Sequence, residues 1–118
     1  MKTLVIGASE KPERYSNKAI RKLISYGHQV VPLAPRAGQV EGMPFETGFP
    51  ELEDIDTITL YIGPARQKAY YTYLLELKPR RIIFNPGTEN QELELLATQH
   101  GIETITDCTL VLLDNGMY

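Results

Sequence analysis

Short apolar runs alternate along this chain with longer amphipathic stretches. The runs are rich in β-branched and leucine side chains, which is typical of buried strands. They fall at residues 4–6, 30–33, 57–62, 81–84 and 102–105. Three of the intervening stretches carry apolar side chains at helical spacing, at residues 16–26, 64–78 and 91–100. The pattern therefore predicts five strands and three helices.

The ends of the predicted helices carry their own signals. Ser16 is expected to be an N-cap, because its hydroxyl can accept a bond from a free N–H of the first turn. Gly27 suits the left-handed turn that ends this helix, and Pro64 suits a first helical position. Residues 88–91 (TENQ) have the spacing of a capping box. The second helix is expected to bury one apolar face, made by Ala65, Ala69, Tyr73, Leu74 and Leu77.

Two segments interrupt this alternation. Residues 34–50 are rich in glycine and proline, which predicts a loop, with a short edge strand near residues 43–45. Residues 110–113 are apolar and are expected to dock on the core. Their pattern leaves open whether they form a strand or a turn of helix.

Strands joined through helices form a parallel sheet covered on both faces. The chain is therefore expected to be an α/β protein with three layers and a five-stranded, mainly parallel sheet, in one domain over residues 1–118. In such sheets ligands bind beyond the carboxyl ends of the strands, where the strand order reverses. This geometry selects four candidate segments, at residues 7–17, 34–36, 62–66 and 85–90.

Composition narrows the class of protein. A length of 118 residues fits one domain, and the net charge of −3 argues against a nucleic-acid binder, which usually has a basic surface. No apolar run approaches the length of a membrane span, and the N-terminus does not resemble a signal peptide. The lone Cys108 cannot form an internal disulfide, which fits a reducing cytoplasm.

The segment after the first strand has the features of a phosphate-binding loop. Gly7, Ala8 and Ser9 are small, so the backbone there can approach a ligand closely. The helix that follows offers free N–H groups and a positive dipole end to an anion, and Lys11 and Arg14 add positive charge. The alternative is an ordinary surface loop with solvated charges.

This loop does not have the dinucleotide fingerprint. Glycines would be needed at positions 9 and 12, which are Ser9 and Pro12, and the loop is also too long. The second strand is followed by Arg36 instead of the acidic residue that holds the ribose hydroxyls of NAD. Arginine suits a ribose phosphate, which both NADP and coenzyme A (CoA) carry. A solvated Arg36 is the alternative.

Other candidate residues have structural explanations beside the functional ones. His28 and His100 adjoin glycines at helix ends, so helix-dipole complementarity explains them better than catalysis. Cys108 is expected to be structural, since cysteine is often buried, although it could exchange disulfides with the thiol end of a bound CoA. No set of His, Cys, Asp or Glu residues has the spacing of metal ligands.

The predicted second helix carries three tyrosines, Tyr70, Tyr71 and Tyr73. They either cover the core or form a homodimer patch.

Several motifs resemble the stand-alone CoA-binding proteins, which are similar to the CoA-binding domain of the succinyl-CoA synthetase α-subunit. These motifs are residues 5–9 (VIGAS), 14–17 (RYSN) and 30–36 (VVPLAPR), and residues 87–90 and 101–108 also follow the family pattern. The resemblance implies a Rossmann-like fold with the diphosphate of CoA on the loop at residues 7–17.

The resemblance also implies a role for each candidate segment. Ser16 and Asn17 would cap the helix beside the phosphates, and Pro35 and Arg36 would border the ribose and adenine. The segment after the third strand would form the opposite wall, and the segment after the fourth would approach the pantetheine arm. The expected ligand contacts are Gly7, Ala8, Ser9, Lys11, Arg14, Tyr15, Ser16, Asn17, Pro35, Arg36, Ile62, Gly63, Pro64, Asn85, Pro86 and Gly87.

The leading hypothesis is therefore a protein that binds CoA or an acyl-CoA without catalysis of its own, alone, as a homodimer or with a partner enzyme. One alternative is a small enzyme that acts on CoA thioesters or disulfides through Cys108. Another is a binder of NADP or a different adenine nucleotide.

Overall fold

The computed structural model describes residues 1–118. Its main sheet has five strands in the order β2-β1-β5-β6-β7. Every neighbouring pair in this sheet is parallel. The predicted α/β fold with a five-stranded parallel sheet is confirmed, and it is Rossmann-like. The strands are β1 (Lys2–Ile6), β2 (Gln29–Leu33), β5 (Thr57–Leu60), β6 (Arg81–Phe84) and β7 (Glu103–Thr106).

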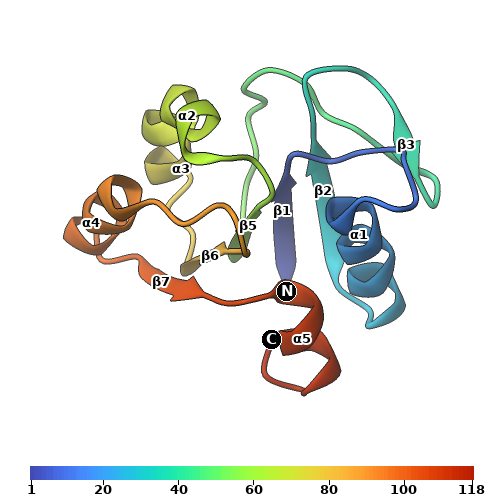
Figure 1. Cartoon of the computed structure of the whole chain (residues 1–118). Helices are drawn as coiled ribbons and strands as arrows, with labels where there is room; N and C mark the ends of the chain where they lie inside the picture. Colours follow the sequence, from blue (N-terminus) through green and yellow to red (C-terminus); the bar gives the residue numbers. More distant parts are fainter.

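Helices cover both faces of this sheet (Figure 1). One face carries α1 (Tyr15–Ser25) and α5 (Thr109–Asp114), which are joined by an ion pair of 2.8 Å between Lys22 and Asp114. The other face carries three helices and a 3-10 turn. These are α2 (Pro64–Gln67), η1 (Lys68–Tyr70), α3 (Tyr71–Glu76) and α4 (Gln91–Gln99). None of the helices combines the length and apolar character needed to cross a membrane.

The core is divided by the sheet, as the alternation of side chains along a strand requires. Leu4 and Ile6 of β1 belong to the larger cluster, which includes Leu74 of α3 and Leu93 of α4. Val5 points to the opposite face and packs in a smaller cluster with residues of α1 and α5. Strand β1 is therefore buried on both sides and forms the centre of the molecule.

The connection after β5 differs from the predicted strand and helix. The strand ends at Leu60 instead of Ile62, and the predicted helix is divided into α2, η1 and α3. Ala65 and Ala69 are exposed, so the predicted apolar face is wrong in this part. Gln67 is the residue that points inward, and it is fully buried. A glutamine can take this place because its side chain is completely hydrogen-bonded, as described below.

Two predicted helix caps are also wrong. Helix α1 begins at Tyr15, with Arg14 in the N-cap position and no side-chain cap, so Ser16 lies buried within the first turn. Helix α4 is capped by Asn90 instead of Thr88, since the Asn90 Oδ1 accepts from the Leu93 N–H at 3.3 Å. Each prediction named a residue of a suitable type two positions away from the true cap. The left-handed stop at Gly27 is confirmed (φ +84°).

The glycine-rich segment 34–50 forms a small hairpin beside the sheet. Strand β3 (Gln39–Val40) pairs with β4 (Met43–Pro44) in an antiparallel manner, near the predicted edge strand. Glu46 then returns to the end of β2, where its backbone bonds to Ala34 and Pro32 at 3.0 and 2.8 Å. The segment 110–113 is helical and lies within α5.

Gly7 fixes how closely the ends of β1 and β5 approach. Its φ is +97°. A Cβ atom there would lie 3.0 Å from the Ile62 Cγ2 and 3.0 Å from the backbone carbonyl of Tyr61. Both the conformation and the contact therefore require glycine.

We predict that Gly7→Ala destabilises the protein more than Gly27→Ala. Both positions have positive φ, but nothing lies within 4 Å of a Cβ built at Gly27. The conformational cost of about 1–2 kcal/mol applies to both, whereas overpacking adds about 1–3 kcal/mol only at Gly7. Urea unfolding measures both free energies. If both variants lose the same free energy of unfolding, the chain around residue 7 relaxes and relieves the overpacking, which would contradict this prediction.

Candidate functional site

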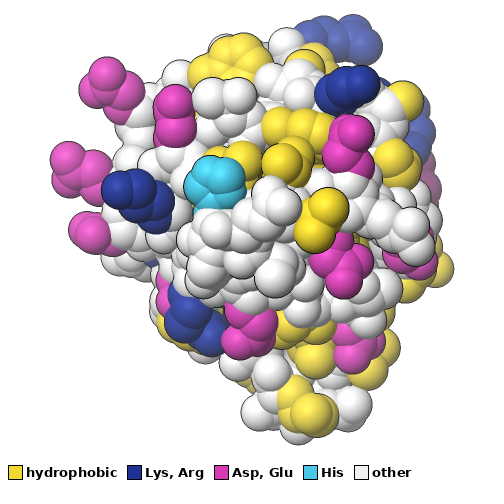
Figure 2. All heavy atoms as spheres, turned by 90° about the vertical axis from the view of Figure 1, so that its left-hand side faces the viewer, with side chains coloured by type: hydrophobic (Ala, Val, Ile, Leu, Met, Phe, Trp, Pro, Cys, Tyr) yellow, Lys and Arg dark blue, Asp and Glu magenta, His cyan; other side chains and the backbone are white.

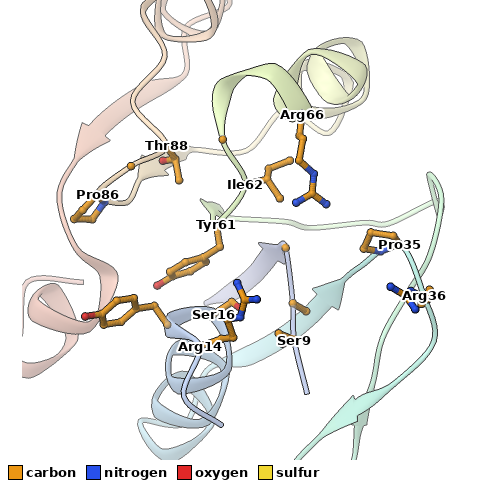
Figure 3. Close-up of a pocket in the computed structure, with 15 residues that line it drawn as sticks. Ser9, Arg14, Ser16, Pro35, Arg36, Tyr61, Ile62, Arg66, Pro86 and Thr88 are labelled. Carbon is orange, nitrogen blue, oxygen red and sulfur yellow. The ribbon is translucent and has the colours of Figure 1, made fainter. Parts of the chain in front are cut away.

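A cavity of about 500 Å³ opens at the carboxyl ends of four strands. Residues that follow β1, β2, β5 and β6 form its walls, together with the first turns of α1 and α2. Figure 3 shows Pro35 and Arg36 at one end of the cavity and Pro86 and Thr88 at the other. Strand β1 lies between β2 and β5, so the cavity lies where the strand order reverses, as the sequence predicted.

Twelve of the sixteen predicted site residues line this cavity. They are Gly7, Ala8, Ser9, Arg14, Tyr15, Ser16, Pro35, Arg36, Ile62, Gly63, Pro86 and Gly87. Lys11, Asn17, Pro64 and Asn85 do not line it. Three further residues do, which are Tyr61, Arg66 and Thr88. Arg66 and Thr88 lie in the segments 62–66 and 85–90, which the sequence selected. Tyr61 was expected in the strand at residues 57–62.

One of the residues outside the cavity, Asn17, supports the loop that lines it. The Asn17 Nδ2 donates to the Ser9 carbonyl at 2.9 Å, and its Oδ1 accepts from the Arg21 Nε at 2.8 Å. Asn17 therefore shapes the loop from within the first turn and caps nothing. Pro64 is exposed at the start of α2.

The backbone around the loop offers a limited set of donors. The N–H groups of Gly7 and Ala8 both donate to the Leu33 carbonyl, at 3.0 and 3.1 Å. These two amides join the loop to β2 and are not free for a ligand. In the first turn of α1, the N–H groups of Tyr15 and Ser16 have no backbone acceptor, as is usual at a helix N-terminus. An anion in the cavity would meet the positive end of this helix.

The charges around the cavity are all positive. Arg14, Arg36 and Arg66 reach it from three different sides (Figure 3), and no aspartate or glutamate lines it. None of the three guanidinium groups is in an ion pair, because the ion pairs of the protein are Lys22–Asp114 and Arg80–Asp56. By contrast, the face that carries α2, α3 and α4 mixes acidic and basic side chains with hydrophobic ones (Figure 2). The cavity thus suits a ligand with several negative charges.

Gln67 holds two walls of the cavity together. Its Nε2 donates to the Ile62 carbonyl at 2.9 Å and to the Thr88 carbonyl at 2.8 Å. Its Oε1 accepts from the Asn90 Nδ2 at 2.9 Å. The side chain is fully buried, and it ties the segment after β5 to the segment after β6. The positions of Ile62 and Thr88 in the cavity wall therefore depend on this one amide.

Asn85, the residue that follows β6, also ties separate segments together. Its Nδ2 donates to the Thr59 Oγ1 at 2.6 Å and to the Leu60 carbonyl at 2.8 Å. Its Oδ1 accepts from the Thr109 N–H at 2.9 Å. Both amide hydrogens are used within the protein, and the residue is 2% exposed. Asn85 therefore anchors the start of α5 to the centre of the sheet.

Tyr61 contributes its ring to the cavity wall. Its hydroxyl is buried without a hydrogen-bond partner, although the Thr59 and Thr109 hydroxyls lie near and bond to each other at 2.7 Å. Burial raises the pKa of Tyr61 well above its usual range, and the two threonine hydroxyls offset this only in part. Tyr61 is therefore a neutral side chain at physiological pH.

The remaining candidates lie outside the cavity. The His28 ring packs on Tyr118 with centroids 5.0 Å apart, and the His100 Nδ1 lies 2.9 Å from the Leu96 carbonyl. Tyr73 packs inward and donates to the Pro50 carbonyl at 2.6 Å. Cys108 is half-buried at the start of α5, and its thiol makes no hydrogen bond. No group of three or more His, Cys, Asp or Glu side chains is arranged to hold a metal ion.

The fold and the site together define a Rossmann-like protein with an arginine-lined cavity at its topological switch point. A family model described as the CoA binding domain matches residues 1–114. The chain belongs to this family, as the sequence motifs indicated. Membership supports CoA binding in general terms.

Solved structures share this fold. An uncharacterized protein with a crystal structure is 45% identical, with a TM-score of 0.97, over 99% of this chain and 97% of that one. A conserved hypothetical protein from Pyrococcus furiosus is 26% identical, with a TM-score of 0.81, over 93% of this chain and 97% of that one. No curated protein matches this chain.

A larger enzyme contains a domain of the same fold. It is the dinucleotide-forming acetyl-coenzyme A synthetase 1 of Ca. Korarchaeum cryptofilum, solved in complex with phosphate and ADP. It is 20% identical, with a TM-score of 0.71, over 90% of this chain and 25% of that one. At this identity the likeness shows the shared fold alone.

We predict that Gln67→Met lowers the free energy of unfolding by at least about 2 kcal/mol. Methionine fills a similar volume but leaves two buried carbonyl groups without donors, and each unsatisfied group costs about 1–3 kcal/mol. Gln99→Met on the exposed end of α4 is the matched control and should change stability by less than about 0.5 kcal/mol. Urea unfolding compares the two. Equal stability of both variants would mean that Gln67 does not hold the cavity walls.

Proposed function

We propose that this protein binds CoA, or an acyl-CoA thioester, in the cavity at the carboxyl ends of the strands. The observation that carries the proposal is the set of three unpaired arginines, Arg14, Arg36 and Arg66, around a cavity without carboxylates. CoA has a diphosphate and a ribose phosphate, so it presents negative charge at two separate places. Arginine is well suited to both, because its planar fork can bond two phosphate oxygens at once.

The arrangement of the walls supports one orientation of the ligand. The diphosphate would lie over Ser9 and the first turn of α1, with Arg14 and Arg66 on either side. The ribose phosphate and adenine would lie at the end bordered by Pro35 and Arg36. The pantetheine arm would then leave toward the opposite end, past Pro86 and Gly87.

The lining favours a binding role over catalysis. Of the side chains that usually act as general bases or nucleophiles, no carboxylate, imidazole or thiol lines the cavity. We therefore propose that the protein holds CoA for storage, for sensing or for transfer to a partner enzyme. Binding of NADP or another adenine nucleotide shares part of this chemistry and is separated from CoA binding by the tests below.

We predict that CoA binds with a dissociation constant in the micromolar range and that Arg66→Ala weakens this binding by about tenfold or more. A hydrogen bond to a charged group contributes about 1.5–3 kcal/mol. Lys68→Ala is the matched control, because Lys68 is an exposed cation in the next turn that does not line the cavity. Isothermal titration calorimetry measures both variants. Absence of CoA binding up to about millimolar concentration would overturn the proposal.

We further predict that Arg36→Ala weakens binding of CoA by about tenfold but leaves binding of dephospho-CoA nearly unchanged. This follows if the Arg36 guanidinium contacts the ribose phosphate that dephospho-CoA lacks. The same titrations with NADP and NAD rank the other nucleotides. Tighter binding of NADP than of CoA would make the protein a dinucleotide binder, and equal losses for CoA and dephospho-CoA would place Arg36 away from the ribose phosphate.

A further inference from the structure

A second, smaller cavity of about 220 Å³ adjoins the first. Its walls are formed by Tyr15, Tyr61, Asn85, Pro86, Cys108 and Leu110. Three of these residues, Tyr15, Tyr61 and Pro86, also line the first cavity. The second cavity therefore begins where the first one ends, at its Pro86 end. This is the end opposite Arg36 (Figure 3).

The chemistry of the second cavity differs from that of the first. No charged residue lines it. Asn85 is its most polar wall residue, but both hydrogens of the Asn85 amide are already donated, to the Thr59 Oγ1 and the Leu60 carbonyl. The Tyr61 hydroxyl is itself buried, so Tyr61 presents its ring to the space. What remains for an occupant is a mainly apolar surface without charge, with the Cys108 thiol and the exposed Tyr15 side chain in the wall.

We propose that the second cavity receives the acyl group of a short-chain acyl-CoA, so that the preferred ligand is the thioester and not free CoA. This inference rests on the proposed function. A CoA thioester is charged at its nucleotide end and apolar at its acyl end, and the two cavities follow each other in the same order. The pantetheine arm would pass the residues that both cavities share.

The volume sets the size of the acyl group. A cavity of about 150 Å³ with apolar walls is large enough for benzene. Of the volume of about 220 Å³, part would be taken by the thioester group and the end of the pantetheine arm, so the rest holds an acyl group of about four to six carbons. Leu110 lies in the first turn of α5 and closes one side of this space. Its size should consequently set the longest chain that fits.

The test compares CoA with butanoyl-CoA and octanoyl-CoA by calorimetry, for the natural protein and for variants at Leu110. Burial of each methylene group strengthens binding by about fourfold, so butanoyl-CoA should bind at least about tenfold more tightly than CoA. Leu110→Trp fills the cavity and should abolish this preference while CoA binds as before. Leu110→Ala enlarges it and should move the preference toward octanoyl-CoA.

Val111→Trp is the matched control, because Val111 is the next residue of α5, is 48% exposed and lines neither cavity. It should keep the preference for butanoyl-CoA, and unchanged CoA affinity in Leu110→Trp shows that this variant is folded. If CoA binds but butanoyl-CoA binds no more tightly, or if Leu110→Trp keeps the preference, the acyl subsite is overturned and the proposed function stands. If neither ligand binds, both are overturned.

Discussion

The reversal of strand order at β1 is the constraint on which the rest of this structure depends. The chain leaves β1 toward α1 on one face of the sheet, and it leaves the neighbouring β5 toward α2 on the other face. The two connections diverge, and a crevice opens between them. Gly7 keeps the crevice narrow at its base, since only a residue without a Cβ can lie against the Tyr61 carbonyl. The position of the cavity thus follows from topology, and its width at the base follows from one glycine.

Buried amides then separate the structural polar groups from those that are free for a ligand. Gln67 and Asn85 direct all their donors to backbone or side-chain acceptors within the protein. Buried polar groups that are satisfied in this way hold the walls rigidly. The charged groups that line the first cavity are all cationic, and the second cavity has no charged group. Because the two cavities adjoin and only the first has charged walls, the ligand is proposed to lie with its charged end in the first cavity and its apolar end in the second.

The sequence was sufficient to predict the parallel sheet, the switch point and most of the cavity wall, because loops that follow buried strands must meet at one edge. It was not sufficient for features that depend on packing between distant segments. Arg66 lies in the selected segment 62–66 but was not named as a site residue, because the apolar face predicted for the helix after Pro64 gave no reason to direct this side chain toward the cavity. The burial of Gln67 was not predicted, because a buried glutamine needs hydrogen-bond partners. Those partners, Ile62, Thr88 and Asn90, come from separate segments that only the fold brings together. The second cavity depends on where α5 docks, which the apolar pattern of residues 110–113 left open.

The central claim is that the charged end of CoA lies over the first turn of α1, between Arg14 and Arg66. A titration of the isotope-labelled protein with CoA, followed by the amide resonances in nuclear magnetic resonance spectra, tests this most directly. The account predicts that the largest shifts occur at Ser9, Tyr15 and Ser16, with smaller ones at Gly87. Shifts concentrated on the outer face of α4, around Leu95 and Thr98, would place the ligand elsewhere and would contradict the account.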